Sequence, residues 1–310
     1  NAVGAVIGDL SVIDASSFSG DITYTISGEG SENFEVVDGQ LKLKDTFSAN
    51  YEVLSTYQIT ITATDISGYT KSSTYQFTVV DVNDAPTAIA LSSNAINENE
   101  SGAIVGTLTT TDEDANDTHT YTLTGTDADS FEIVNGQLKL KDSVSANYEE
   151  KNSYSVTVTA TDSGGLSTSN DFTITINDVN EAPTDIDISR TGLMDNTDAA
   201  VVGTLTTVDE DTVDNHTYTV SDDRFEVVDG VLKLKAGVTI DNLVEPTVTI
   251  NVTTTDKGGL TYQEEFTLTV GTVQVTATQF EENAVGAVIG NLSVIDTSFS
   301  GTITYTLSGE

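Results

Sequence analysis

Asp81-Val82-Asn83-Asp84-Ala85-Pro86 is the stretch that organises this sequence, and it returns 97 residues later as Asp178-Val179-Asn180-Glu181-Ala182-Pro183. Both copies follow a run in which apolar side chains alternate with threonine, and both end in proline. Carboxylate and amide oxygens are the ligands that a hard divalent cation prefers. Because proline restricts its own backbone to a narrow range of φ, we expect a linker between domains whose stiffness depends on bound metal.

A spacing of 97 residues also separates other matching residues, which is typical of tandem modules. Asp112 is repeated as Asp209, and His119 is repeated as His216. A later loop is three residues shorter in its second copy. We therefore predict three modules and the beginning of a fourth. They cover residues 1–84 (module 1), 85–181 (module 2), 182–271 (module 3) and 272–310 (module 4).

Each complete module contains short segments in which apolar residues alternate with Thr or Ser, as in half-buried strands. Residues 119–123 and 154–160 are examples in module 2. The dipeptides Asp38-Gly39, Asn135-Gly136 and Asp229-Gly230 separate pairs of such segments and predict tight hairpins. Seven strands per module without an amphipathic helix predict an all-β fold of tandem, seven-stranded Greek-key β-sandwiches of the immunoglobulin-like type.

The composition excludes several classes of function. The chain has 49 acidic and 11 basic residues and a net charge of −38, which disfavours binding to nucleic acid or to an anionic membrane. It has no cysteine, which excludes disulfides, thiolate metal sites and cysteine nucleophiles. No apolar stretch of about 18 residues occurs, so we expect no membrane insertion.

The two ends of the sequence are related to each other. Residues 283–310 nearly repeat residues 1–29, and residues 273–278 precede that repeat as a candidate first strand. The first strand of module 1 would precede Asn1, so we expect module 1 to lack it. Without a signal-peptide pattern, and with an end in mid-strand, the sequence is interpreted as a window of a longer protein. The alternative is a head-to-tail fibre subunit that exchanges strands.

Acidic elements recur at the predicted strand ends and loops. In module 2 they are Asn97-Glu98-Asn99, Asp112-Glu113-Asp114, Asn147-Tyr148-Glu149 and Asp162. Such positions let carboxylates converge without any of them being buried singly, which would be costly. Together with the linker, these elements resemble the calcium-binding motifs of cadherin repeats, in the form common in large bacterial surface proteins. The resemblance covers the whole chain and implies Ca²⁺ as the bound metal.

The resemblance implies a ligand set at each of two junctions, made of glutamates from the preceding module, linker residues and aspartates from the following module. Between modules 1 and 2 the set is Glu52, Asp81, Asn83, Asp84, Asp112, Asp114 and Asp162. Between modules 2 and 3 the set is Glu98, Glu149, Asp178, Asn180, Glu181, Asp209, Asp211 and Asp256.

The motifs are incomplete elsewhere. Module 1 has only Asp14 where the Asp-x-Asp pair is expected, and residues 271–275 after module 3 have neither the acidic linker motif nor a proline. The acidic residues left at that third junction are Glu245, Asp195 and Asp296. We expect it to bind calcium poorly and to depend on packing by Val273, Val275 and Phe280.

No catalytic centre is predicted. His119 and His216 recur without a serine in a nucleophile-elbow context, so we interpret both as strand residues held by their place in the repeat. The sequence therefore predicts a structural protein: a calcium-stiffened segment of an extracellular adhesin, matrix or filament protein, at the cell surface or in a secreted matrix. Its expected partners are neighbouring modules of the same or identical chains. The alternative is a calcium-dependent recognition module that binds carbohydrate or a partner cadherin-like domain.

Overall fold

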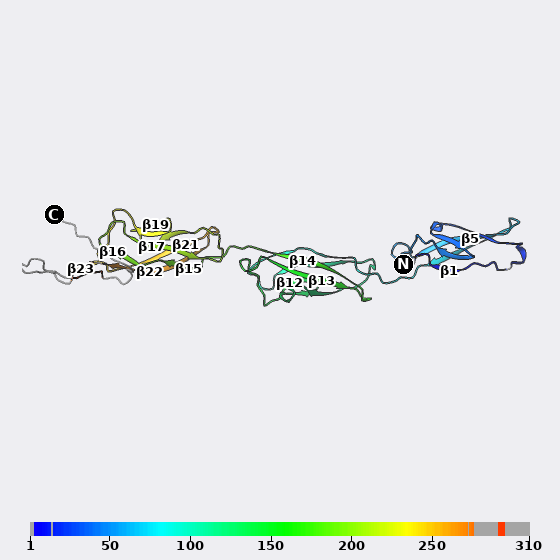
Figure 1. Cartoon of the computed structure of the whole chain (residues 1–310), viewed down its shortest axis with the longest axis horizontal. Coiled ribbons are helices and arrows are strands. Elements are labelled where there is room, and N and C mark those ends of the chain that lie inside the picture. The colour runs from blue at the N-terminus through cyan, green and yellow to red at the C-terminus, as the bar shows by residue number, and fades with distance from the viewer. Residues whose placement is uncertain (1–2, 14, 272, 276–290, 295–310) are drawn as a thin grey trace, which may run out of the picture. The chain divides into compact units, whose positions relative to one another are not determined.

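The computed structural model describes residues 3–13, 15–271, 273–275 and 291–294 (Figure 1). The chain forms two compact units, residues 1–177 and 178–310. Unit 1 contains module 1 and nearly all of module 2, and unit 2 begins at the second copy of the acidic linker. The finer division into four modules stays a prediction.

Module 1 consists of two three-stranded sheets within the described residues. The first sheet has the order β1-β4-β3 and contains β1 (Val6–Asp9), β3 (Phe34–Val37) and β4 (Gln40–Leu43). The second has the order β2-β5-β6 and contains β2 (Thr23–Ser27), β5 (Thr56–Thr64) and β6 (Thr70–Thr78). Two short 3₁₀ helices, η1 (Ala15–Ser17) and η2 (Ser31–Asn33), lie in its loops.

Module 2 has two four-stranded sheets. One has the order β11-β12-β9-β7 and contains β7 (Ala88–Leu91), β9 (Ile104–Thr111), β11 (Phe131–Val134) and β12 (Gln137–Leu140). The other has the order β10-β13-β14-β8 and contains β8 (Ala95–Asn97), β10 (Thr120–Thr124), β13 (Ser153–Thr161) and β14 (Ser167–Asn177). The 3₁₀ helix η3 (Ala128–Ser130) precedes β11.

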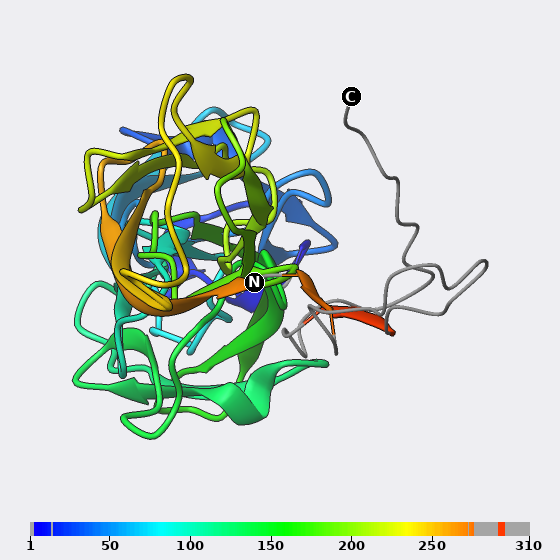
Figure 2. The ribbon, with the colours of Figure 1, turned by 90° about the vertical axis from the view of Figure 1, so that its left-hand side faces the viewer.

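Module 3 repeats this arrangement. One sheet has the order β15-β17-β20-β19, with β15 (Asp185–Ile188), β17 (Val201–Val208), β19 (Phe225–Val228) and β20 (Val231–Leu234). The other has the order β16-β22-β21-β18, with β16 (Gly192–Met194), β18 (Thr217–Val220), β21 (Thr247–Thr255) and β22 (Thr261–Gly271), the long orange strand in Figure 2. Beyond them, β23 (Val273–Val275) pairs with β24 (Leu292–Val294).

The β-sandwich class is confirmed, and in modules 2 and 3 the short strands β8 and β16 add one strand to the seven that the sequence predicts. In module 2 the first predicted strand is β7, after which the chain crosses to the other sheet, so that β7 pairs antiparallel with β9 and β8 pairs parallel with β14. The chain passes close to β9 at this crossing, where a side chain on Gly106 would collide with Ser92 and Ser93. The single segment that contains β7 and β8 therefore adds an edge strand to each of the two sheets.

The predicted hairpins are confirmed, because their backbone angles are those that Asn-Gly and Asp-Gly adopt most readily. Asn135 and Gly136 have φ values of 52° and 76° between β11 and β12, and the Asp-Gly turns of modules 1 and 3 are equivalent. The two sheets of module 2 share an apolar core that contains Val105 and Leu138 from one sheet and Ile174 from the other. Threonines on these strands face outward, which is the alternation that the sequence predicts.

Candidate metal centre

The acidic linker of unit 1 is held by hydrogen bonds to two loops of module 2. The backbone N–H of Asp84 donates to Asp114 Oδ2 over 2.8 Å. Asn83 Nδ2 donates to Asp162 Oδ2 over 3.0 Å and to the carbonyl oxygen of Asp84 over 3.1 Å. Asn83 lies against Gly164, where any side chain would collide with it. The linker motif, the Asp-x-Asp pair and the later loop aspartate are therefore brought together, as the sequence predicts.

Two overlapping groups of carboxylates lie at this linker. Glu52, Asp81 and Asp114 each place an oxygen within 4.8 Å of the other two, and Glu52 also forms such a group with Asp84 and Glu113. Glu52 and Asp81 are exposed, whereas Asp114 is half-buried. Glu113 was not in the predicted ligand set, although it stands inside the Asp112–Asp114 motif. Four of the seven predicted members therefore converge at one place.

These carboxylates repel one another, and no ion pair with a basic side chain relieves that repulsion among the described residues. They therefore fit a cation. No ion pair formed by the described residues involves Glu52, Asp81 or Asp114. The hydroxyl oxygen of Ser48 is buried beside them, without a hydrogen-bond partner among the described residues. It lines a cavity of about 440 Å³ together with Asp84. Oxygen ligands, negative charge and an unsatisfied hydroxyl are the donor set that suits Ca²⁺.

A second group lies deeper in module 2. Asp112, Asp117 and Asp162 place carboxylate oxygens within 4.8 Å of one another. His119 Nε2 lies 2.8 Å from Asp112 Oδ2, so the imidazole is directed at a predicted ligand. Burial alone would raise the pKa of Asp162, but hydrogen bonds from Asn83, Leu166 and Gly165 outweigh it and hold this pKa below its ordinary value. Asp162 is therefore an anion that both the linker and its own loop stabilise.

Unit 2 repeats the arrangement in module 3. The backbone N–H of Glu181 donates to Asp211 Oδ2 over 2.9 Å, and Asn180 Nδ2 donates to Asp256 Oδ2 over 2.9 Å. Asn180 lies against Gly258 as Asn83 lies against Gly164. Glu181 stands where the first linker has Asp84. The hydrogen bond is the same at both linkers because the backbone N–H of this residue, not its side chain, is the donor.

The field at the second linker is strongly negative. Burial, followed by the charges of Asp178, Asp209 and Asp214, raises the pKa of Asp211 above its ordinary value, and the hydrogen bond from Glu181 only partly opposes this. Like charges that raise one another's pKa are relieved by a bound cation. The pKa of Asp211 is therefore raised mainly because its carboxyl group is buried, and the three neighbouring carboxylates add to this.

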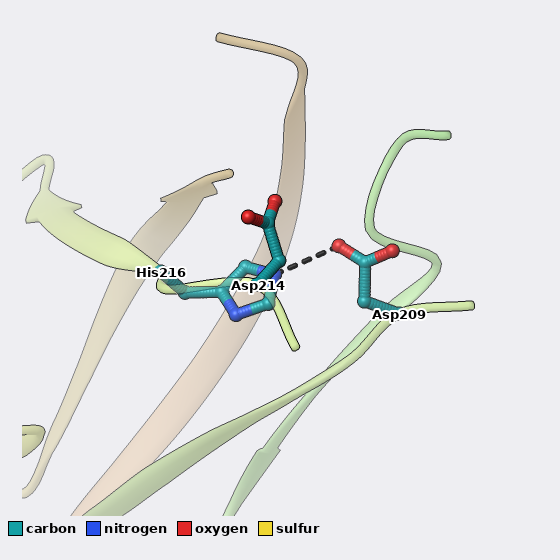
Figure 3. A group of neighbouring side chains, drawn as sticks. All are labelled: Asp209, Asp214 and His216. Carbon is teal, nitrogen blue, oxygen red and sulfur yellow. Dashed lines mark hydrogen bonds and ion pairs between the residues drawn. The ribbon is translucent and has the colours of Figure 1, made fainter. Parts of the chain in front are cut away.

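His216 and Asp214 were not in the predicted ligand set of this site. His216 Nε2 lies 2.7 Å from Asp209 Oδ2, and Figure 3 shows Asp214 beside this pair. The three side chains form a group of possible metal ligands. Both histidines directly precede a strand rather than lie within it, and each faces an aspartate. The exact recurrence of Asp117-x-His119 as Asp214-x-His216 was the available signal.

Glu98 and Glu149 are the members of the second predicted set that belong to unit 1. Glu98 is 1% exposed, and its Oε2 accepts a hydrogen bond of 2.6 Å from the backbone N–H of Tyr148. Glu98 and Glu149 place carboxylate oxygens within 4.8 Å of each other. The other six members belong to unit 2, so the complete set between modules 2 and 3 stays a proposal.

The acidic residues near the end of module 3 have protein partners. Arg224 donates to both carboxylate oxygens of Glu245, over 2.6 Å and 3.0 Å. Asp195 Oδ1 accepts the backbone N–H of Asn242 over 2.8 Å. An arginine thus supplies the positive charge that a metal would supply elsewhere. Asp14, Asp296 and Phe280, which the sequence analysis also considered, lie outside the described residues.

Comparison with known proteins agrees with this fold. Residues 92–177 match the family model for the cadherin domain. Similar solved structures include protocadherin gamma B7 extracellular cadherin domains 1–4, with a TM-score of 0.62, 24% identity, and coverage of 87% of this chain and 72% of that chain. Mouse protocadherin-24 domains EC1–3 have a TM-score of 0.58 and 23% identity, and the match covers 87% of this chain and 93% of that chain.

A third match is protocadherin gamma B2 extracellular cadherin domains 3–6, with a TM-score of 0.60, 16% identity, and coverage of 97% of this chain and 80% of that chain. Residues 92–177 thus match the cadherin domain, and the chain shares the fold of tandem cadherin repeats. Two of these similar structures are described as extracellular cadherin domains. Within the described residues, no helix is long and apolar enough to cross a membrane.

Proposed function

We propose that this chain is a calcium-stiffened segment of an extracellular adhesin, matrix or filament protein. The observation that carries the proposal is the convergence of Glu52, Asp81 and Asp114, which come from module 1, the linker and module 2. Without a cation these charges repel one another, so the two modules gain freedom to separate. A bound Ca²⁺ neutralises the charges and links the modules through shared ligands.

The residues that would hold calcium in unit 1 are the predicted set with Glu113 added. In unit 2 they are Asp178, Asn180, Glu181, Asp209, Asp211 and Asp256, with Glu98 and Glu149 contributed by unit 1. The third junction differs, because Arg224 already neutralises Glu245. We therefore propose that stiffness is uneven along the chain, with calcium acting at the linkers that begin at Asp81 and Asp178 and not at Gly271.

Calcium titration of the full chain tests this proposal. We expect a dissociation constant of about 10⁻⁵ to 10⁻³ M, a higher melting temperature with Ca²⁺, and a much smaller effect of Mg²⁺, which demands a stricter geometry. Asp114→Asn should weaken calcium binding, whereas Glu29→Gln, an exposed acidic residue of module 1 outside these groups, should not. A melting temperature that a chelator leaves unchanged would overturn the proposal.

Small-angle scattering measures stiffness directly. With Ca²⁺, the wild-type chain should have a larger maximum dimension than with a chelator. Asp209→Ala or Asp211→Ala should reduce that dimension in calcium while circular dichroism still shows intact strands, because both residues lie outside the apolar core of module 3. Loss of the strand signal would instead show that these residues are needed for folding.

The second candidate is a calcium-dependent recognition module for carbohydrate or a partner cadherin-like domain. One observation favours it: Tyr69 is 49% exposed, packs edge-on against Phe18 at 5.1 Å between ring centroids, and lies near the exposed Ile66. One of the similar structures is described as a protocadherin cis-dimer. A glycan array probed with wild type and Tyr69→Ser, in calcium, tests this candidate, and equal signals from both would count against it.

A further inference from the structure

Three side chains of module 3 form a group that combines carboxylate oxygens with an imidazole nitrogen. Asp209 directly follows β17, His216 directly precedes β18, and Asp214 lies in the loop between these strands. Each side chain places one possible ligand atom within 4.8 Å of the other two (Figure 3). Asp209 belongs to the proposed calcium set, whereas Asp214 and His216 do not. An imidazole is also outside the oxygen ligands that Ca²⁺ takes.

The connection between two sheets brings these side chains together. β17 and β18 belong to different sheets of module 3, so residues 209–216 cross from one sheet to the other. The backbone N–H of Asp214 donates to the carbonyl oxygen of Asp211 over 3.0 Å, which closes a tight turn in this loop. His216 thereby returns to Asp209, with 2.7 Å between His216 Nε2 and Asp209 Oδ2. A metal ion bound by these residues would link the two sheets.

Both carboxylates are anchored through one oxygen and keep the other for a metal. Asp209 Oδ1 accepts the backbone N–H of Asp211 over 3.2 Å, which leaves Oδ2 facing the imidazole. Asp214 Oδ2 accepts the backbone N–H of Lys257 over 3.0 Å, and its Oδ1 has no hydrogen-bond partner among the described residues. Within the same residues, no lysine or arginine forms an ion pair with either aspartate. Positive charge at this group is therefore left for a cation to supply.

His216 can change from a hydrogen-bond donor to a metal ligand without breaking another hydrogen bond. An ionised carboxylate only accepts, so Nε2 of the metal-free chain carries the proton that is shared with Asp209. Nδ1 makes no hydrogen bond to the part of the chain that the structure describes, so the ring is free to carry its proton there instead. Nε2 then offers its lone pair to a cation, as a neutral histidine ligand does.

This donor set suits a divalent transition metal such as Zn²⁺. Zn²⁺ binds histidine nitrogen and carboxylate oxygen at about 2.0–2.2 Å, so neighbouring ligand atoms of a tetrahedral site lie roughly 3.4 Å apart. The distance of 2.7 Å between His216 Nε2 and Asp209 Oδ2 is somewhat shorter than this, and the limit of 4.8 Å for the whole group is somewhat longer. Small side-chain rotations therefore bring three ligands around one ion, which leaves a fourth position for water.

The two added ligands occur together in module 2 and are both missing from module 1. In module 2, His119 Nε2 lies 2.8 Å from Asp112 Oδ2, and Asp117 stands two residues before the histidine. In module 1 the equivalent positions hold Gly20 and Ile22. The aspartate and the histidine are thus both present or both absent, as is expected of residues that bind one ion.

Module 3 offers the better of the two sites. Asp117 Oδ1 accepts the backbone N–H of Thr118 over 2.8 Å, and Asp117 Oδ2 accepts the backbone N–H of Ser163 over 3.4 Å. Both oxygens of this aspartate are therefore occupied, whereas Asp214 keeps one. We expect module 2 to bind the same kind of ion more weakly than module 3.

We propose that Asp209, Asp214 and His216 bind a divalent transition metal of the Zn²⁺ class and that this ion cross-links the two sheets of module 3. The site goes beyond the calcium function, because it lies within a single module and its imidazole favours Zn²⁺ over Ca²⁺. The two functions share Asp209 alone.

Zinc titration of the full chain, without an affinity tag and in excess Ca²⁺, tests the site. The chain has two histidines and no cysteine, so a His119→Asn background leaves His216 as its one histidine. We expect saturable binding that His216→Asn or Asp214→Asn weakens by at least about tenfold, the loss that even an outer-shell change causes. Asp223→Asn, which removes an exposed carboxylate of module 3 outside the group, is the matched control and should bind zinc normally. Absence of binding, or equal binding by all three variants, would overturn the proposal.

NMR of wild-type chain that contains nitrogen-labelled histidine identifies the ligand atom and does not depend on the folding of any variant. Without metal, the ring of His216 should carry its proton on Nε2. With Zn²⁺, the proton should move to Nδ1, and the Nε2 signal should shift to that of a metal-bound nitrogen. A merely structural histidine would not show this change. A ring that keeps its Nε2 proton in saturating zinc would contradict direct binding.

Calcium titration of the same variants separates this site from the calcium function. His216→Asn should lower zinc affinity far more than calcium affinity. Equal losses would overturn the proposal and make His216 a residue that only holds the calcium ligand Asp209 in place. A chain that binds calcium but not zinc would refute this inference alone, whereas a chain that binds zinc but not calcium would refute the calcium function and leave the transition-metal site standing.

Discussion

Modules 1 and 2 share six strands with the same pairing order but differ in how far their cores are closed within the described residues. Leu41 and Leu138 occupy the same hairpin position in the two modules, opposite Gly8 and Gly106. Leu41 and Leu138 are both buried, but Ile7, which lines an open groove beside β4, is 39% exposed, whereas Val105 at the same repeat position is 3% exposed. The difference teaches that these six strands leave the core partly open. In module 2 the short strands β7 and β8, at the start of the module, close it.

The same two modules also differ in how they use one aspartate. Asp65 accepts hydrogen bonds of 2.7–3.1 Å from Ser19, Ser67 and Tyr69, all within module 1. Asp162 stands at the same repeat position but accepts a hydrogen bond from the linker residue Asn83. An identical loop residue is therefore a local structural anchor in one module and part of a junction in the next.

The largest expected effect is the loss of stability when a core side chain is truncated. Leu138→Ala should destabilise module 2 by about 3–5 kcal/mol, because it leaves a cavity in a closed core. Ile7→Ala should cost module 1 about 2 kcal/mol or less, because the Ile7 side chain is already 39% exposed. Hydrogen exchange read by mass spectrometry resolves each module, which a single unfolding curve of a multidomain chain does not. Equal losses would contradict the difference in closure.

A second effect separates the two aspartates. Asp162→Asn should weaken calcium binding by about tenfold or more, since it removes a charge next to the linker. Asp65→Asn should leave calcium affinity unchanged and lower the melting temperature of module 1 equally with and without calcium. Calorimetric titration and melting of both variants check this expectation. A loss of calcium affinity in Asp65→Asn would remove the distinction between the two loops.

The smallest expected effect concerns acid stability. Hydrogen bonds from Ser67, Ser19 and Tyr69 hold the pKa of Asp65 well below its ordinary value of 3.8. Between the native and ordinary pKa values the unfolded chain binds more protons than the native chain, so stability rises with pH there. This contribution is complete above the ordinary pKa and is lost as the pH falls through the native pKa.

Urea unfolding of wild type and Asp65→Asn from about pH 6 down to about pH 2 measures this contribution. The difference in free energy of unfolding between the two should be constant near neutral pH and should shrink on acidification. A difference that grows in acid would show that the sign is wrong. Asp129→Asn, an exposed aspartate of module 2, is the control and should leave the pH dependence of module 1 unchanged.

Several features could be predicted from the sequence because they depend on neighbours along the chain. Alternation of apolar and hydroxyl residues determines which face of a strand is buried, and Asn135-Gly136 determines a hairpin within two residues. The repeat spacing then aligned Asp112 with Asp209 and separated the linkers from the sandwiches. The predicted ligands Asp81, Asp84 and Asp114 converge because each stands at the end of a strand whose place in the repeat was already given.

Other features required the tertiary structure because they join residues far apart in sequence. Whether Asp65 meets Ser19, and whether Glu245 meets Arg224, depends on how loops lie across two packed sheets, and the same residue types occur in every module. The chain can cross between the sheets after Leu91 only because it passes close to Gly106, which has no side chain. Composition and spacing determined that this chain repeats a β-sandwich with acidic linkers. Only the packing of the sheets decided how the core is closed, because the closing strands β7 and β8 pair with β9 in one sheet and β14 in the other.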